Sequence, residues 1–274
     1  MNALSVKNRT IKDFGDQWIK YPDNEGYYGS MELFSDILFP FLKPIDLKNC
    51  RVAEIGSGTG RIVNMLLESG VRHVLALEPS GSFEVLNRNI RDPDRVTCLK
   101  LTGDQLHADG DLDYIFSIGV LHHISHPKPV VEAVYRALKT GGQFLIWLYG
   151  REGNELYLAF IHPLRLITKH LPHFALAGLV WMIYYPLTLY LWLCRRCPLP
   201  MGDYLLSILE KMSPEKRRLV IYDQLNPDYA KYYTKTEAMK LLSDGGFINV
   251  RSHHRHGYSW TVIGTKSGPS TERK

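Results

Sequence analysis

The sequence predicts an α/β fold with a mostly parallel sheet, helices on both faces and a helical insertion late in the chain. Three observations support this prediction. Short apolar runs alternate with helical patterns up to residue 149, as in repeated strand, helix, strand units. A helical stretch interrupted by prolines then replaces that alternation over 150–233. Two strand-like runs follow, over 247–253 and 258–265.

The alternating part contains five predicted strands. They span residues 51–55, 73–77, 96–101, 113–118 and 143–148, and the helices between them include 62–67 and 127–138. Strands separated by helices are joined by crossovers and therefore pair in parallel. Their carboxyl ends then lie at one edge of the sheet, where open α/β proteins bind ligands.

The same patterns divide the chain into parts. We expect an N-terminal helical cap segment over 1–46, a ligand-binding α/β core over 47–149, a helical insertion over 150–233, a helix and two strands that complete the core over 234–266, and a flexible tail over 267–274. The completing helix begins with Thr234-Lys-Thr-Glu237, which has the spacing of a capping box.

Composition sets broad limits on location and metal binding. The 274 residues include 33 Lys and Arg against 28 Asp and Glu, and this net charge of +5 is too mild to indicate nucleic acid by itself. The N-terminus lacks the apolar core of a secretion signal, so we expect a cytoplasmic protein. Cys194 and Cys197 have the spacing of a metal-binding pair, but no second pair accompanies them, and we predict no metal site.

A glycine-rich loop gives the sharpest functional signal. The segment Glu54-Ile-Gly56-Ser57-Gly58-Thr-Gly60 follows the first strand and opens the first helix. Glycines there allow a ligand to approach the main chain closely. The second strand ends in Glu78, where a carboxylate can accept hydrogen bonds from ribose hydroxyls. The two features together predict a cofactor that contains a nucleoside.

The pattern E-x-G-x-G-x-G resembles the first motif of class I S-adenosylmethionine (SAM)-dependent methyltransferases. Three later segments extend the resemblance: Leu77-Glu78-Pro79-Ser80, Gly103-Asp104-Gln105 and Leu138-Lys-Thr-Gly-Gly142, the last with Thr140 where the family usually has proline. The resemblance implies a Rossmann-like seven-stranded sheet whose last strand is antiparallel, with SAM as cofactor and S-adenosylhomocysteine as product. An NAD-type oxidoreductase is the rival reading, and Arg61 at the sixth position of the dinucleotide fingerprint opposes it.

The resemblance also implies which residues surround the cofactor. Glu54 and the glycines would contact its amino acid part, Glu78 the ribose, and Asp104 with Gln105 the adenine edge. The full predicted set is Glu54, Gly56, Ser57, Gly58, Gly60, Glu78, Pro79, Ser80, Asp104, Gln105, Ile118 and Gly119. In related methyltransferases a leading helix closes over the cofactor, so Phe14 and Trp18 either do the same or pack on the sheet.

His122 and His123 are the predicted catalytic residues. They follow the fourth strand, at the edge of the sheet where the ligand is expected. A histidine there can take a proton from an oxygen or nitrogen acceptor. A packed, structural pair is the alternative.

For the acceptor, the sequence favours a small molecule or a lipid-linked compound in a largely apolar pocket. Nucleic acid is expected to be an unlikely partner, because residues 118–121 lack the Asn/Asp-Pro-Pro-aromatic turn of many nucleobase methyltransferases and no stretch interleaves basic and aromatic residues. A tRNA or other nucleic-acid methyltransferase, and a non-catalytic module with this fold, stay open as alternatives.

The stretch FALAGLVWMIYYPLTLYLWLC, residues 174–194, has no charged side chain and is just long enough to span a membrane. Pro186 is expected to break a helix in its middle. Three readings are open: a packed acceptor lid whose apolar faces are covered, a lid that also makes peripheral contact with a membrane, and a true span. The sequence does not predict the oligomeric state.

Overall fold

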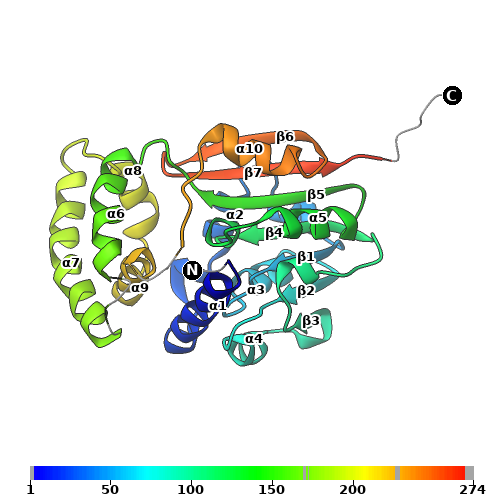
Figure 1. Ribbon diagram of the computed structural model, residues 1–274, viewed down its shortest axis with the longest axis horizontal. Helices are drawn as coiled ribbons and strands as arrows, with labels where there is room; N and C mark the ends of the chain where they lie inside the picture. Colours follow the sequence, from blue (N-terminus) through cyan, green and yellow to red (C-terminus); the bar gives the residue numbers. More distant parts are fainter. Residues whose placement is uncertain (1–2, 169–170, 172, 226–228, 269–274) are drawn as a thin grey trace.

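The computed structural model describes residues 3–168, 171, 173–225 and 229–268 (Figure 1). The predicted cap segment, insertion and tail each include residues that lie outside the described ones, namely 1–2, 169–170, 172, 226–228 and 269–274.

The described chain alternates helices and strands up to residue 149 and is then mainly helical until β6. The strands are β1 Arg51–Ile55, β2 His73–Leu77, β3 Val96–Leu99, β4 Leu112–Ile118, β5 Leu138–Tyr149, β6 Phe247–Arg255 and β7 Ser259–Lys266. The α-helices are α1 Ala3–Lys20, α2 Met31–Leu38, α3 Arg61–Glu68, α4 Phe83–Asn89, α5 Lys128–Ala137, α6 Glu155–Thr168, α7 His173–Cys194, α8 Gly202–Tyr204, α9 Pro214–Leu225 and α10 Lys235–Ser243. Short 3-10 turns lie at η1 Gly26–Gly29, η2 Pro44–Leu47, η3 Pro93–Arg95, η4 Gly103–Gln105 and η5 Leu121–His123, and a π-helical turn at η6 Leu205–Leu209.

The strands form one seven-stranded sheet in the order β3-β2-β1-β4-β5-β7-β6. The first five strands pair in parallel, and β7 pairs antiparallel with both β5 and β6. The predicted mostly parallel sheet with an antiparallel last strand is therefore confirmed. Chain order reverses between β1 and β4, so the loops after these two strands border the crevice in which such sheets bind ligands.

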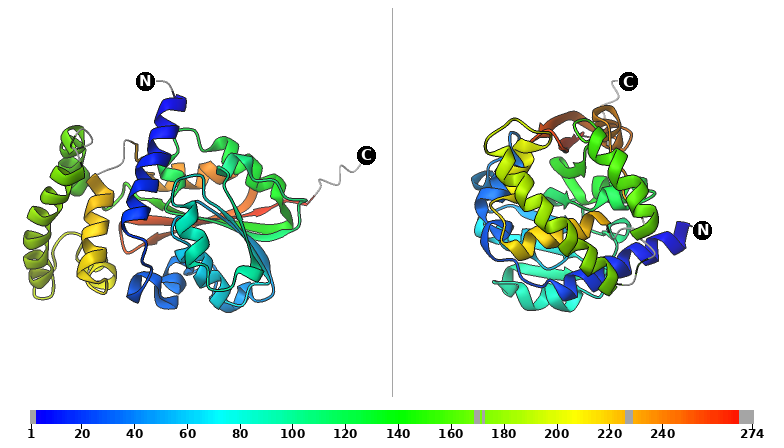
Figure 2. Two further views of the ribbon diagram at one scale, coloured as in Figure 1. Left: turned by 90° about the horizontal axis from the view of Figure 1, so that it is seen from below. Right: turned by 90° about the vertical axis from the view of Figure 1, so that its left-hand side faces the viewer.

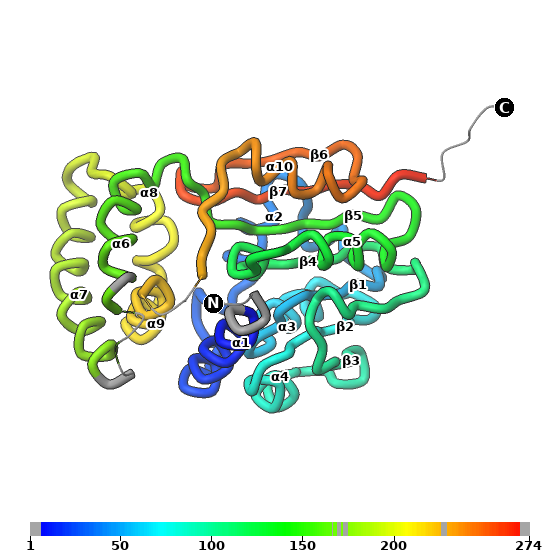
Figure 3. The backbone as a smooth tube through the Cα atoms, viewed as in Figure 1, coloured from blue at the N-terminus to red at the C-terminus, as the bar shows by residue number. Residues whose placement is uncertain are grey.

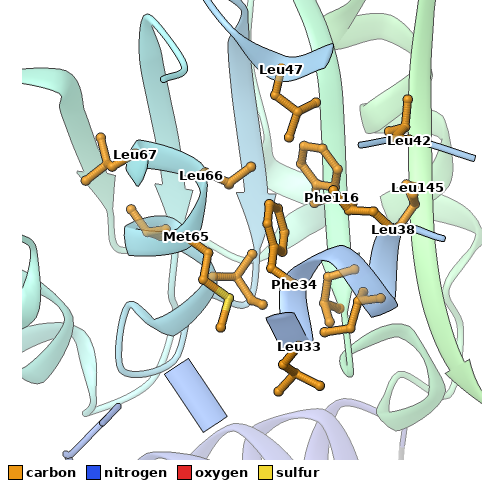
Figure 4. Packing of buried hydrophobic residues seen from close by; sticks show 14 of the residues in the cluster. Leu33, Phe34, Leu38, Leu42, Leu47, Met65, Leu66, Leu67, Phe116 and Leu145 are labelled. Carbon is orange, nitrogen blue, oxygen red and sulfur yellow. The ribbon is translucent and has the colours of Figure 1, made fainter. Parts of the chain in front are cut away.

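Helices cover both faces of the sheet (Figure 1). On one face α2 and α3 pack through Phe34, Leu38 and Leu66 onto Phe116 of β4 and its neighbours, as Figure 4 shows. On the other face the apolar side chains of α5 and α10 pack on the inner strands. Burial on both sides explains why consecutive residues of β1 and β4 are apolar, as Val52 and Ala53 and as Ile115 and Phe116 are.

Helix α1 lies between the sheet and α9, as the tube in Figure 3 and the left view of Figure 2 both show. A hydrogen bond from Gln17 Nε2 to Asp223 Oδ1, 2.9 Å long, ties the two helices together. The N-terminal segment and the helical insertion therefore meet at the carboxyl edge of the sheet.

Helices α6 to α9 form the insertion, with α7 at its outer side (Figure 1). The predicted break of the hydrogen-bond ladder at Pro186 does not divide α7, which runs as one helix of 22 residues with Pro186 inside it. Proline lacks one backbone N–H and so removes one ladder bond. Helix α7 packs against α9.

The two sides of α7 have different surroundings. Leu176, Val180 and Leu191 are buried, whereas the outer side exposes Trp181, Tyr185 and other apolar residues. Of the three open readings, the packed lid with all its apolar faces covered therefore does not match this helix. Within the described residues, Ala175–Cys194 is the one helix long and apolar enough to cross a membrane, and only 17% of its most apolar window is buried.

Candidate cofactor and acceptor site

The loop between β1 and α3 needs its glycines for conformational reasons. Gly56, Gly58 and Gly60 have φ angles of 75°, 53° and 83°, in the left-handed region that side chains rarely adopt. A Cβ on Gly56 would also lie 2.5 Å from Cγ2 of Val120. The loop can therefore turn tightly at the crevice, where the N–H groups of Gly56 and Ser57 donate to the carbonyl oxygen of Leu77.

Glu78, which follows β2, holds this loop in place. Its Oε2 accepts a hydrogen bond from the N–H of Gly58 at 2.7 Å, and its Oε1 accepts one from the N–H of Ser80 at 2.9 Å. A carboxylate offers about four acceptor positions, so both oxygens retain capacity for ligand hydroxyls. Glu78 is thus both a wall of the crevice and a brace for the glycine loop.

Glu54 carries a buried, unpartnered oxygen in the wall of the crevice. Its side chain is 2% exposed, and its Oε2 has no hydrogen-bond partner within the described structure. Burial raises the pKa of this carboxyl to about 8, while the hydroxyl of Ser57 and the charge of Arg61 lower it by less. A buried acceptor without a partner is costly, so this position suits a ligand that brings a cationic N–H donor.

The turn η4 places Asp104 and Gln105 differently. Asp104 lines the crevice, and both its oxygens lie 3.2 Å from Nζ of Lys7 on α1. Partial burial raises the pKa of Asp104, but hydrogen bonds from Thr102 and Lys7 outweigh it and hold the pKa below its usual range. Gln105 is exposed, and its Oε1 accepts from the N–H of Thr102 at 3.0 Å, so it caps the turn outside the crevice wall.

These residues enclose a cavity of about 380 Å³. Its wall includes Glu54, Gly56, Ser57, Gly58, Glu78, Pro79, Ser80, Asp104, Ile118 and Gly119 from the predicted cofactor set. Helix α1 adds Thr10, Phe14 and Trp18 to the wall, so the N-terminal helix covers the cavity. Gly60 and Gln105 are the members of the predicted set that do not line it.

The two histidines after β4 have different surroundings. His122 is fully buried, its ring stacks on Tyr149 with centroids 3.9 Å apart, and both ring nitrogens lack partners within the described structure. Burial, followed by the charge of His123, lowers the pKa of His122 well below its usual value, so the ring is neutral. It lines neither this cavity nor the one described next.

His123 does line the first cavity. Its Nδ1 lies 2.9 Å from the carbonyl oxygen of Tyr229, and a carbonyl only accepts, so Nδ1 carries the proton and Nε2 keeps its lone pair. Burial lowers the pKa of His123, and the charge of Asp223 partly opposes this shift. The ring is therefore neutral in the free protein.

A second cavity of about 670 Å³ adjoins the first and lies under the insertion. Its wall is largely aromatic and aliphatic, with Tyr149, Tyr157, Tyr190, Tyr204, Tyr232 and Tyr258 among the lining residues. Helices α6 and α7 contribute Phe160, Ile183 and Leu187 to this wall. The residues shared by both cavities are Trp18, Tyr28, Arg61, Ile118, Gly119 and Asp223.

A chain of hydrogen-bonded side chains lies along the wall of the second cavity. Asp223 Oδ2 accepts from the hydroxyl of Tyr149 at 3.3 Å, and that hydroxyl accepts from Gln224 Nε2 at 2.9 Å. Gln224 Oε1 accepts in turn from the hydroxyls of Tyr157 and Tyr232 at 2.7 and 3.0 Å. Polar groups so placed can orient a ligand that the aromatic walls bind.

Comparison with known proteins identifies the core. Residues 53–144, which carry the glycine loop, Glu78, Asp104 and the histidine pair, match the model of the methyltransferase domain family. The chain contains a class I SAM-dependent methyltransferase domain. The cofactor of the domain is therefore SAM.

Curated relatives of the methyltransferase domain carry the name tRNA U34 carboxymethyltransferase. The protein of Sulfurimonas denitrificans is 26% identical over 166 residues, which cover 56% of this chain and 56% of that protein. The Vibrio cholerae protein is 31% identical over 124 residues, covering 44% of this chain and 38% of that one. The chain thus spans about half or less of the length of these relatives.

Solved structures share the fold. One chain in the complex of the Haloferax volcanii Trm112 methyltransferase activator with a methyltransferase superposes with a TM-score of 0.51 at 12% identity. The match covers 87% of this chain and 90% of that one. At this identity the likeness concerns the arrangement of helices and strands alone.

The relatives contradict two predictions. A small-molecule or lipid-linked acceptor, and the expectation that nucleic acid is an unlikely partner, both conflict with relatives that are named for tRNA. Both predictions relied on the absence of two short sequence patterns that are typical of proteins acting on nucleic acid. Cations and aromatic rings can instead be brought together by folding, as Arg61 and Tyr232 are in the wall of the second cavity, where Arg165 donates to the hydroxyl of Tyr232.

The residues of the domain fit SAM on two counts. The unpaired, buried Oε2 of Glu54 matches the ammonium group of the amino acid part, and the left-handed glycines leave the main chain open to close approach.

Within the described residues, no group of three or more His, Cys, Asp and Glu side chains could hold a metal ion.

Sequence reasoning missed several wall residues of the two cavities. Lys7 and Thr10 lie on a helix whose sequence carries no ligand motif, and Asp223 lies in a segment without any family pattern. One signal was available for Asp223: it is an acid on a helix where Leu219, Ile221 and Leu225 are buried. An acid so close to a buried stripe faces either a partner or a site.

Proposed function

We propose that this protein transfers a methyl group from SAM to a nucleotide of tRNA. The observation that carries the proposal is the junction of the two cavities, where Arg61, Gly119 and Asp223 belong to both walls. A donor in the first cavity and a nucleobase in the second would meet there. The relatives named for tRNA support this acceptor class.

On the donor side, Glu54 is proposed to accept from the ammonium group, and the main chain of Gly56 to Gly60 with Ser57 to surround the amino acid part. Glu78 would accept from ribose hydroxyls beside Pro79 and Ser80, and Asp104 would hold the adenine end. Bound SAM supplies an electrophilic carbon on a sulfonium. The cover formed by α1 would exclude water, which favours a reaction in which charge disappears.

On the acceptor side, the tyrosines of the second cavity supply faces on which an extruded base can stack. Tyr149 and Tyr232 already stack with centroids 5.2 Å apart. The hydrogen-bonded side chains from Asp223 to Gln224 would read the polar edge of the base. In this proposal the insertion over 150–233 is the acceptor lid and the segment over 1–46 is the cap of the donor cavity.

The predicted catalytic role of the histidines stays a prediction. His123 is the better placed of the two, because it lines the donor cavity and its Nε2 keeps a lone pair. The stacked position of His122 behind Tyr149 supports a packing role.

A tRNA acceptor fits a cytoplasmic location. Association with a membrane surface is the finer part of the location proposal, and the outer side of α7 supports it, where Trp181 and Trp192 are about half exposed. The guanidinium of Arg196 lies 3.7 Å from the ring centroid of Trp192. Co-sedimentation with anionic vesicles tests this: the wild type should pellet, and the double change of Trp181 and Trp192 to Glu should not. If the wild type does not pellet with the vesicles, the proposed association with a membrane surface is wrong.

The acceptor proposal is tested by incubating the purified protein with SAM labelled in its methyl group and with total tRNA. We expect label in acid-precipitated tRNA that disappears when the tRNA is digested with nuclease before the incubation. A parallel incubation uses cell extract freed of RNA. Label in that extract, with none in tRNA, would contradict the proposed acceptor.

A further inference from the structure

We propose that the carboxylate of Asp223 is the catalytic group that takes the proton from the acceptor atom. This inference rests on the proposed function, because it names the residue that completes the transfer at the same junction. Asp223 lies on α9, outside the segment that matches the methyltransferase family.

The position of Asp223 is the first argument. It is the one acidic residue that belongs to the described walls of both cavities, so it faces the space where donor and acceptor meet. The acids Glu54, Glu78 and Asp104 line only the donor cavity, and Glu155 only the other. An acceptor bound in the second cavity therefore meets the Asp223 carboxylate at the boundary that its reactive atom must reach.

The fixed orientation of Asp223 is the second argument. Its Oδ1 accepts from Gln17 Nε2 at 2.9 Å, and its Oδ2 accepts from the hydroxyl of Tyr149 at 3.3 Å. Gln17 is 3% exposed and comes from α1, while Tyr149 is 7% exposed and comes from β5. Two buried donors from separate elements thus hold the carboxylate, and each oxygen keeps a further lone pair. Such support keeps a reacting group in the geometry that catalysis needs.

His123 is the rival proton acceptor. Its Nδ1–H donates to the carbonyl of Tyr229, and its ring packs against Phe14 with centroids 4.6 Å apart. It lines the donor cavity but not the second one. The lone pair on its Nε2 is therefore available from the donor side, whereas Asp223 is reached from both sides.

The step balances as follows. A lone pair on the acceptor oxygen or nitrogen forms the new bond to the transferred carbon. The bond from that carbon to the sulfonium sulfur breaks, and its electron pair stays on sulfur. The proton on the acceptor atom passes to a carboxylate oxygen of Asp223, which later releases it to solvent. No further oxidant, reductant or metal is required.

The test compares Asp223→Asn with Glu215→Gln, an exposed change on the same helix, and with His123→Gln. Single-turnover transfer is measured on the fraction that the wild type labels, tRNA or RNA-free extract, and S-adenosylhomocysteine affinity is measured by calorimetry. We expect Asp223→Asn to lower the rate by about 10²- to 10⁴-fold with the affinity kept, and Glu215→Gln to match the wild type. Formate or acetate should partly restore transfer by Asp223→Ala.

Several outcomes would overturn the inference. A wild-type rate in Asp223→Asn on labelled tRNA overturns it while the proposed acceptor stands. Loss of S-adenosylhomocysteine binding in Asp223→Asn assigns the residue to the donor instead. A rate lost only in His123→Gln gives the role to the histidine, and a wild type that labels neither fraction contradicts both proposals. If Asp223→Ala is inactive and no carboxylate restores it while the protein is folded, Asp223 acts as a support.

Discussion

Glu54→Gln should change how the stability of the free protein depends on pH. The Glu54 carboxyl is 2% exposed, its Oε2 has no partner within the described structure, and burial raises its pKa from 4.5 to about 8. The folded protein therefore binds a proton at this site more tightly than the unfolded chain does. This contribution to stability is fully present below pH 4.5 and is lost as the pH rises through about 8.

The size of the effect follows from the shift in pKa. One pKa unit corresponds to about 1.4 kcal/mol, so between about pH 5 and pH 8 the wild type should lose roughly 3 kcal/mol of stability from this site. Glutamine has the same shape and does not titrate. Between about pH 5 and pH 8, the free energy of unfolding of Glu54→Gln should therefore rise by roughly 3 kcal/mol relative to that of the wild type. This corresponds to a change in the Tm difference between the two proteins on the order of 10 °C.

The assay is thermal unfolding without ligand at several pH values. Buried neutral histidines such as His122 and His123 titrate in the same range with opposite sign, and comparison with the variant cancels them. The exposed change Glu84→Gln is the matched control and should parallel the wild type. Parallel curves for Glu54→Gln and the wild type would refute the reasoning about this carboxyl.

The remaining predictions concern ligand binding and turnover. Gly58→Val should abolish SAM binding in a folded protein, because the residue has a φ of 53°, which a valine rarely adopts. Normal affinity of the variant for SAM in calorimetry would show that the loop is not part of the site. Glu78→Ala should weaken SAM binding by about 1–3 kcal/mol, since it removes an acceptor and frees the N–H of Gly58; unchanged calorimetric affinity would argue against the ribose assignment. His122→Ala should lower Tm and leave single-turnover rates near normal, and a large rate loss with an unchanged Tm would restore it as a catalytic residue.

Local sequence patterns were enough to predict the sheet and the donor cavity. The glycine loop, the end of β2 and the start of α3 lie within 25 residues of one another, and the conformations of Gly56 and Gly58 are properties of the residues themselves. The side chain of Glu78 meets Gly58 across 20 positions through the pairing of two parallel strands, which the alternation of elements already implied.

The acceptor side could not be read in the same way. Asp223 meets Gln17 across 206 positions, a contact that only the folding of the insertion onto α1 produces. His122 and His123 are neighbours in sequence, yet one stacks behind Tyr149 and the other lines the donor cavity. Helix α7 likewise packs against α9, a contact that no local pattern reveals.

The central claim is that the two adjoining cavities serve group transfer to tRNA. Mass spectrometry of nucleosides from tRNA incubated with SAM and the purified protein tests it most directly. We predict one nucleoside of increased mass with the wild type and none with Gly58→Val, and the mass difference identifies the transferred group. If the wild type binds SAM and labels RNA-free extract but leaves the tRNA unmodified, the claim is contradicted.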